Sequence, residues 1–199
     1  MSKLQGSMAD AKSSTEKRYH MLKWPLVGGA LLIGSLNSPL MSGKDWKWFD
    51  YHPIAMAISF IMLSGLATLL KKIGGYENTK THGVLFSVAT ALGGFGLYVI
   101  YSNKEMLSKP HFATLHGKLG LASYVAYVGL NLVGGAALHP DWGILKTNKS
   151  LRTIHKYSGR MALMLSWAAA YTGFSNLETD GIKMSAVAAY LGVLSYFMW

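Results

Sequence analysis

The chain of 199 residues contains no cysteine and few charged side chains. Without cysteine it can form no disulfide framework, no thiolate metal site and no thiol redox centre. Charged residues make up 14% of the chain, whereas a soluble domain usually contains roughly 25%. Hydrophobic residues make up 51%. This composition indicates that lipid, rather than water, surrounds much of the chain.

Acidic residues are also scarce, because nine Asp and Glu stand against 19 Lys and Arg, for a net charge of +10. Such an excess can indicate a nucleic-acid partner. Here, however, the basic residues form short clusters between apolar segments, with no zinc-finger spacing, RNP-like motif or basic heptad array. We therefore expect no nucleic-acid partner.

The first twenty residues, MSKLQGSMADAKSSTEKRYH, lack the apolar core that a cleavable signal peptide needs. They are polar, and we expect a disordered cytoplasmic tail over residues 1–20. The remainder, residues 21–199, shows no linker or shift in composition. We therefore expect a single membrane domain there.

Six apolar segments, each 17–22 residues long, are separated by polar stretches rich in Gly, Pro, Asn and Lys. They are residues 24–41, 54–70, 83–101, 117–138, 157–175 and 182–199. A helix needs about 20 residues to cross the ~30 Å hydrocarbon core of a bilayer. Strand-like alternation is not sustained, and segments 117–138 and 182–199 lack the charged face that a soluble bundle would require. The sequence predicts an all-α membrane protein with six transmembrane helices.

The distribution of Lys and Arg predicts the orientation of these helices. With the N-terminus inside, the inner segments contain 13 basic residues and the outer segments contain 6. Both termini are therefore expected to be cytoplasmic. Trp46, Trp48, Phe49 and Tyr51 precede the second helix and are typical of an aromatic belt at the membrane interface.

Four of the seven histidines, His52, His82, His116 and His155, stand at the starts of predicted helices two, three, four and five. Because successive helices run in opposite directions, His52 and His116 should lie near the outer face of the membrane. His82 and His155 should lie near the inner face. The sequence thus predicts two histidine pairs, each contributed by alternate helices.

Two imidazoles that face each other in an apolar helical bundle suit a haem, whose iron takes axial nitrogen ligands above and below the porphyrin. A zinc site would need a third or fourth ligand, and no Cys, Asp or Glu accompanies these histidines within the helices. Small residues follow the histidines at Gly83, Gly117, Gly120 and Gly159. They would let a flat macrocycle approach the backbone, although small residues also ease helix packing in membranes.

The stretches YHPIAMAISF, THGV, KEMLSKPHFATLHGKLGL and IHKYSGRMAL resemble the cytochrome b561 family of six-helix membrane proteins with two haems. The resemblance covers approximately residues 48–176. It implies two haem b cofactors, with His52 and His116 on the outer haem iron and His82 and His155 on the inner one. The spacing of 30 residues from His52 to His82 is shorter than the family pattern, so the inner loop between them differs.

The resemblance further implies a transmembrane reductase in a vesicle membrane, another endomembrane or the plasma membrane. Cytoplasmic ascorbate would be the electron donor, and monodehydroascorbate or a ferric chelate on the other side would be the acceptor. Whether the bundle forms a homodimer stays open.

Substrate contacts are expected where charged residues lie close to the histidine pairs. Ascorbate is anionic, so the inner basic residues would attract it, although a basic inner loop also follows from the positive-inside rule. The inner candidates are Lys72, Lys80, Arg152 and Lys156, with Lys80 and Arg152 favoured because each lies within three residues of a proposed ligand. On the outer side, His111 could contact an acceptor or transfer a proton. His20 and His139 are assigned to no site.

Two alternatives remain at this point. The first is a haem-free transporter or channel whose histidines form a proton relay. The second is a haem-binding sensor or assembly subunit that exchanges no electrons with a substrate.

Overall fold

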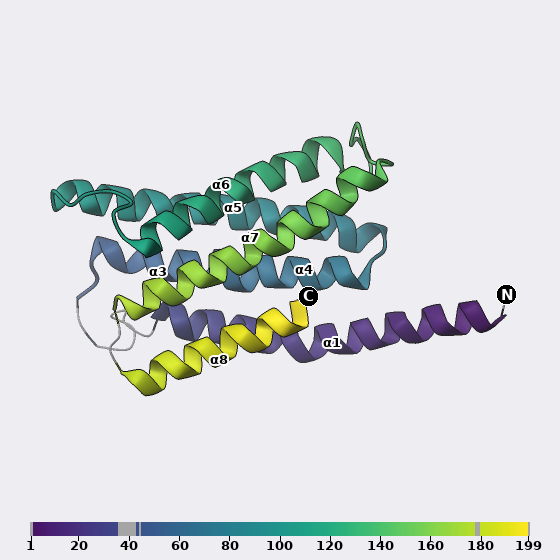
Figure 1. The fold of residues 1–199 in the computed structure, drawn as a ribbon, viewed down its shortest axis with the longest axis horizontal. Coiled ribbons are helices and arrows are strands. Elements are labelled where there is room, and N and C mark those ends of the chain that lie inside the picture. Colours follow the sequence, from purple (N-terminus) through teal and green to yellow (C-terminus); the bar gives the residue numbers. More distant parts are fainter. Residues whose placement is uncertain (1, 36–42, 44, 178–179, 199) are drawn as a thin grey trace.

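The computed structural model describes residues 2–35, 43, 45–177 and 180–198 (Figure 1). Over these residues the chain is helical, with no β-strand, which confirms the all-α prediction. In the described part of the chain, six helical columns run back and forth along the long axis of the molecule. The end of predicted segment 24–41 beyond residue 35 lies largely outside the described residues.

The columns correspond to the six predicted segments, and most are longer than predicted. The first column is α1 (Ser2–Ser35), and the second is continuous from Trp48 to Ile73. This second column consists of η1 (Trp48–Asp50), α3 (Tyr51–Met56), the π-helical stretch η2 (Ala57–Leu63) and α4 (Ser64–Ile73). The others are α5 (Tyr76–Met106), α6 (Leu115–Leu132) with the π-helical η3 (Val133–Ala137), α7 (Lys149–Ser175) and α8 (Gly181–Met198).

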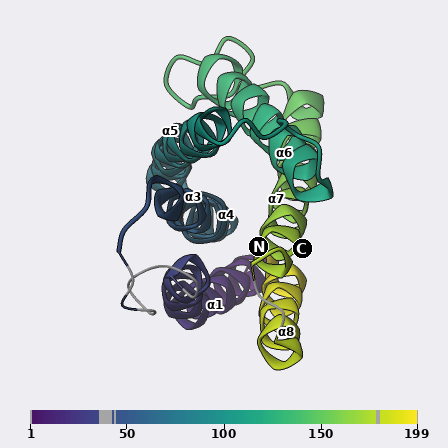
Figure 2. The same cartoon turned by 90° about the vertical axis from the view of Figure 1, so that its left-hand side faces the viewer.

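The columns form a ring when the molecule is viewed along its axis (Figure 2). The second column packs against α5, α5 against α6, and α6 against α7, so these four columns surround the centre. α1 packs on the second column, and α8 packs on α7 and α4. The first and last helices therefore flank one side of a four-column core.

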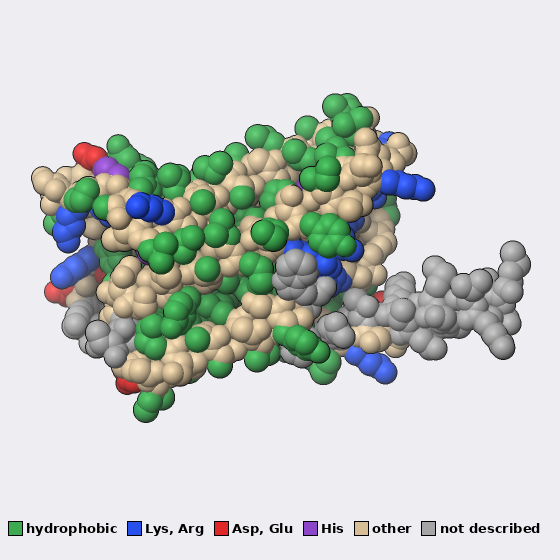
Figure 3. Space-filling view, in the orientation of Figure 1, with side chains coloured by type: hydrophobic (Ala, Val, Ile, Leu, Met, Phe, Trp, Pro, Cys, Tyr) green, Lys and Arg blue, Asp and Glu red, His purple; other side chains and the backbone are tan. Residues whose placement is uncertain are grey.

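Three columns are long and apolar enough to cross a membrane by length and composition among the described residues: Trp48–Ile73, Tyr76–Met106 and Leu115–Ala137. The surface agrees with this assignment, because apolar side chains cover its middle while Lys and Arg gather towards the two ends (Figure 3). Large apolar side chains such as Val84, Val88 and Val125 are exposed. In water such a surface would be costly, whereas lipid accommodates it.

The segment expected as a disordered tail is helical, because α1 begins at Ser2 and continues into the first apolar segment without a break. The physical reason is local. Residues 2–20 contain many good helix formers, including Ala, Met, Leu, Lys and Glu, and no proline before Pro25. Polarity alone therefore did not determine the conformation of this segment.

Two of the four histidines lie inside their helices rather than at the start. His82 is six residues beyond Tyr76, where α5 begins, and His155 is six residues beyond Lys149, where α7 begins. The hydropathy pattern marks where a helix enters the hydrocarbon, whereas the helix itself begins earlier, in the polar interface. The expected position holds for His116, because α6 begins at Leu115.

Side-chain caps fix where α6 and α7 begin. Thr114 caps α6 by accepting a hydrogen bond from the Gly117 N–H at 3.1 Å. Asn148 caps α7 in the same way, through the Leu151 N–H at 2.9 Å. Each cap satisfies one of the N–H groups that the first turn of a helix leaves without a partner.

Candidate functional site

One end of the bundle contains a cavity of about 390 Å³ that holds both His52 and His116. His52 comes from α3 and is buried, and His116 comes from the first turn of α6. Their ring centroids are 6.0 Å apart with an interplanar angle of 79°. Two histidines 64 positions apart in the chain thus face each other across one apolar space.

Both imidazoles are held by backbone carbonyls of a neighbouring helix. His52 Nδ1 donates to the Gly96 carbonyl of α5 at 2.8 Å, and His116 Nδ1 donates to the Ala169 carbonyl of α7 at 2.8 Å. A carbonyl can only accept, so each Nδ1 carries the proton. The Nε2 atom of each ring is then left with a lone pair, which is the form that binds a metal.

Gly173 creates the space for the His116 ring. A Cβ at this position would lie 2.6 Å from His116 Cε1 and 2.8 Å from Nδ1, closer than side chains approach one another. Any larger residue would therefore displace the imidazole from its carbonyl partner. No local pattern in the sequence predicts a role for this glycine, because it lies on α7, far from His116 in the chain.

The other end of the bundle contains a cavity of about 780 Å³ that is lined by His82 and His155. His82 Nδ1 donates to the Ala67 carbonyl of α4 at 3.0 Å. His155 Nδ1 is buried and has no hydrogen-bond partner among the described residues. Gly134, in the π-helical η3, leaves room for this ring, since a Cβ there would contact His155 Cε1 at 3.3 Å.

An aromatic cluster separates the two cavities. Phe60 lines the cavity of His52 and His116, and Phe86 lines the other one. The fully buried Tyr127 contacts both, with ring centroids 4.7 Å from Phe60 and 5.4 Å from Phe86. The two histidine pairs therefore occupy separate compartments at opposite ends of one bundle.

The four glycines singled out in the sequence all line a cavity. Gly83 and Gly159 line the cavity of His82 and His155, while Gly117 and Gly120 line the other. At Gly83, Gly120 and Gly159 a Cβ would meet no atom within 4 Å. These positions open towards space inside the cavities rather than towards a packed helix.

All four basic residues proposed as inner substrate contacts lie around the cavity of His82 and His155, which Lys71 and Arg160 also line. They are Lys72, Lys80, Arg152 and Lys156. Several have protein partners: Lys71 Nζ donates to Thr79 Oγ1 at 2.7 Å, and Arg152 Nε donates to the Lys146 carbonyl at 2.6 Å. The mouth of this cavity is therefore strongly cationic.

His111 lies at the opposite end and lines the cavity of His52 and His116. Its Nε2 is 2.6 Å from Glu105 Oε1, and its ring stacks on Tyr101 with centroids 4.1 Å apart. Lys104, which also lines this cavity, donates to the Pro110 carbonyl at 2.9 Å. A polar rim thus surrounds an otherwise apolar cavity.

Two residues of the cavity of His82 and His155 were not predicted from the sequence as part of a site. His139, assigned to no site, lines it and stacks on Trp142, with ring centroids 3.4 Å apart. Asn131 also lines it and accepts a hydrogen bond from Ser87 at 3.1 Å. A polar side chain in the apolar part of a membrane helix was the available signal for Asn131.

Comparisons of the sequence with known proteins identify a family. Residues 51–179 match the family model of eukaryotic cytochrome b561. The chain is 32% identical over 159 residues to the transmembrane reductase CYB561D2 of Bos taurus, covering 73% of this chain and 69% of that protein. It is 24% identical over 171 residues to the ascorbate-specific transmembrane electron transporter 1 of Zea mays, covering 82% and 70%. It is 32% identical over 150 residues to the transmembrane ascorbate ferrireductase 1 of Arabidopsis thaliana, covering 72% and 63%.

The matched region contains all four histidines, the whole lining of the cavity of His82 and His155, and most of the lining of the other cavity. These findings confirm the resemblance read from the sequence, the membrane location and the expected class of oxidoreductase. They also imply a haem b cofactor, which is what defines a b-type cytochrome. The chain belongs to the eukaryotic cytochrome b561 family.

Proposed function

We propose that the protein transfers electrons across a membrane from ascorbate to an acceptor on the other side, through two b-type haems. His52 and His116 would ligate one haem and His82 and His155 the other. The observation that carries this proposal is the pair of separate cavities, each with two histidines from different helices. Both volumes fall within the range of about 300–1,000 Å³ that is usual for ligand pockets.

The geometry of the outer pair supports ligation of one metal by both rings. A metal bonds an imidazole nitrogen at about 2 Å, so two rings that would share one metal have to lie close together across one cavity. The centroids of His52 and His116 are 6.0 Å apart. The Nδ1 bonds to Gly96 and Ala169 leave the Nε2 atoms as the available ligand atoms.

The inner pair also fits a ligand role. His82 and His155 line one cavity, and the bond from His82 Nδ1 to the Ala67 carbonyl leaves the His82 Nε2 atom available as a ligand. The open positions at Gly83 and Gly159 would let a flat ring system lie against α5 and α7.

When bound, a haem with two histidine ligands carries single electrons and has no free coordination position for a substrate. The side chains of this protein need only hold, orient and shield it. The carbonyls of Gly96, Ala169 and Ala67 orient three of the rings. Phe60 and Tyr127 pack between the compartments and keep water out of the middle of the bundle.

The cationic inner mouth supports binding of the donor. Ascorbate is a small anion, and a cluster of positive charge raises the local concentration of anions. Arg152 has five N–H donors, and its bond to the Lys146 carbonyl uses one of them. We therefore assign the main donor contacts to Arg152 and Lys80, with Lys72 and Lys156 at the rim of the same mouth.

The electron balance is simple. At the inner face the ascorbate monoanion gives up one electron, releases one proton to water and becomes monodehydroascorbate. At the outer face the acceptor, monodehydroascorbate or a ferric chelate, gains one electron beside His111, which lines the outer cavity. This direction requires both termini to be cytoplasmic, in an endomembrane, a vesicle membrane or the plasma membrane.

The first prediction concerns haem content. Purified protein should contain two haem b per chain in a pyridine haemochrome assay, and His116→Ala should contain one, because one ligand of the outer pair is lost. His20→Ala, which alters an exposed histidine of α1, serves as the control and should keep two. Two haems in the His116→Ala protein would remove this residue from the ligand set.

The second prediction tests the space for the His116 ring. Gly173→Ala should weaken or abolish the outer haem, because the added Cβ would lie 2.6 Å from His116 Cε1. Gly129→Ala adds the same methyl group where no atom lies within 4 Å, and it should keep the wild-type absorption spectrum. Equal spectra for both variants would show that His116 does not depend on this space.

The third prediction tests the function itself. In vesicles that enclose a ferric chelate, ascorbate added outside should reduce the enclosed iron only when the protein is present. His116→Ala should keep the reduction of the inner haem by ascorbate but block the transfer to the enclosed iron. A colourless preparation without a Soret band would support a haem-free transporter, whereas a haem protein that ascorbate does not reduce would support a sensor.

The fourth prediction concerns the donor site. Arg152→Ala should raise the KM for ascorbate roughly tenfold or more, as expected for the loss of one hydrogen bond to a charged group, with unchanged haem content. Lys149→Ala removes the same charge one turn earlier in α7 and should change the KM much less. If both variants behave alike in stopped-flow reduction, the basic cluster acts only through its total charge.

A further inference from the structure

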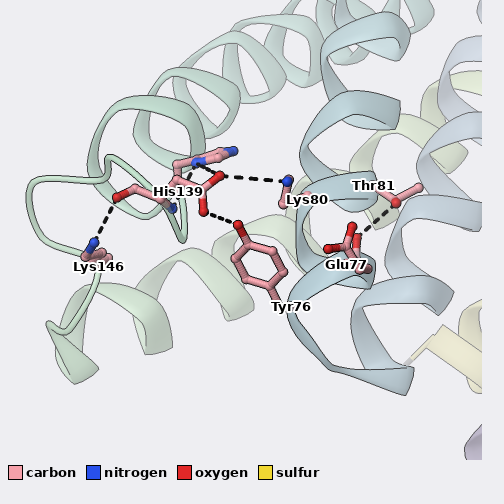
Figure 4. Close-up of polar contacts among 7 residues, drawn as sticks. Tyr76, Glu77, Lys80, Thr81, His139 and Lys146 are labelled. Carbon is pink, nitrogen blue, oxygen red and sulfur yellow. Dashed lines mark hydrogen bonds and ion pairs between the residues drawn. The ribbon is translucent and has the colours of Figure 1, made fainter.

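The loop between η3 and α7 contacts the start of α5 through the side chain of Asp141. Figure 4 shows His139 and Lys146 of this loop opposite Tyr76 and Lys80 of α5. One carboxylate oxygen of Asp141 accepts a hydrogen bond from the Tyr76 hydroxyl. The other is 3.9 Å from the ammonium nitrogen of Lys80. The Lys80 ammonium also lies over the Tyr76 ring, 4.9 Å from its centroid. An acidic residue of the loop thus engages one of the two cations assigned above to the donor.

The loop holds Asp141 in a well-defined position. The Gly143 N–H donates to the His139 carbonyl at 2.9 Å, and the Lys146 ammonium donates to the Asp141 carbonyl at 2.8 Å. A Cβ at Gly143 would lie 2.5 Å from the His139 carbonyl oxygen, so the turn requires glycine. Trp142 Nε1 donates to the Gly135 carbonyl at 3.0 Å, which ties the turn back to η3.

The Asp141–Lys80 pair lies at the mouth of the inner cavity. His139, Pro140 and Trp142, the neighbours of Asp141 in the loop, line that cavity together with Lys80. The side chains of both partners are more than a third exposed, at 36% for Asp141 and 39% for Lys80. Ion pairs with this exposure are weak, because water solvates both charges. An anion that enters the mouth could therefore replace the carboxylate beside Lys80.

We propose that Asp141 is a specificity-determining residue that competes with the anionic electron donor for Lys80. This inference rests on the proposed function, because it assumes that a small organic anion binds at the inner mouth. With the mouth empty, Asp141 neutralises part of its positive charge and holds the Lys80 ammonium towards the loop. The donor has to displace this carboxylate, so Asp141 lowers the affinity for the donor and disfavours weakly bound anions.

The test is the effect of Asp141→Asn on the reduction of the haem-loaded protein by ascorbate under anaerobic conditions. The amide can still accept a hydrogen bond from Tyr76 but carries no charge. We expect the KM for ascorbate to fall severalfold while the limiting rate at saturation stays unchanged. Glu77→Gln, a matched control, removes a charge three residues before Lys80 and leaves the Asp141–Lys80 pair intact.

A double-mutant cycle shows whether the effect passes through Lys80. Asp141→Asn should lower the KM in the wild-type background and have no effect in a Lys80→Met background, because the two residues then no longer interact. An unchanged KM, an equal change in Glu77→Gln, or a full effect without Lys80 would each overturn the proposal. A raised KM would overturn it as well, since it would mean that Asp141 only supports the loop.

A second readout does not depend on electron transfer. The folded protein is treated with an amine-reactive ester and then digested, and mass spectrometry of the peptides gives the rate of acylation at Lys80. Ascorbate should protect Lys80, and it should do so at a lower concentration in Asp141→Asn than in wild type. If ascorbate protects Lys80 but does not reduce the haem, the proposed function fails while the competition stands. Equal protection curves in the two proteins would refute the competition itself.

Discussion

The hydrogen bond from an imidazole Nδ1 to a helix carbonyl is the interaction on which the rest of this structure depends. Burying an imidazole in an apolar bundle is costly unless its N–H has an acceptor. In a helix each carbonyl already accepts one backbone hydrogen bond, but its second lone pair can accept another. Gly96, Ala169 and Ala67 supply such carbonyls to His52, His116 and His82. The same bond that makes burial tolerable determines which nitrogen faces the cavity.

The packing of the helices leaves space for the imidazole rings and for the cavities that the rings line. Gly173 and Gly134 occupy positions where a methyl group would press on His116 or His155. The second of these glycines lies in η3, a π-helical stretch, and such irregularities often occur at functional sites because they redirect side chains. In the middle of the bundle, between the two cavities, Phe60 and Tyr127 fill the space instead. The bundle is thus open near its two ends and closed at its centre.

The two ends of the bundle differ in charge. The mouth near His82 and His155 is cationic and suits an anionic donor. The rim near His52 and His116 combines His111 with Glu105, and its charge is mixed. The cationic mouth is also not uniform, because Asp141 opposes one of its lysines. In our proposal, binding of an anionic donor at this mouth depends on attraction by the basic residues and on competition from Asp141, rather than on total charge alone.

The sequence by itself determined the helical class and the number of helical columns. It also determined that His52 lies near His116 and that His82 lies near His155. The helices could be predicted locally, because an apolar run of about 20 residues predicts a spanning helix. The histidine pairs could be predicted because successive spanning helices run in opposite directions. Hydropathy did not determine where the helices begin, because α5 and α7 start in polar residues. Residues 2–20, polar and expected to be a disordered tail, are helical in the structure, where their helix propensity is high.

Only the tertiary structure decided the partners of these residues. The acceptors of His52 and His116 lie 44 and 53 positions away in the chain, and Asp141 lies 65 positions from Tyr76. Such contacts depend on how each helix is rotated about its axis and on the depth at which it packs against its neighbour. That rotation results from the packing of all the helices together, so no single segment of the sequence encodes it.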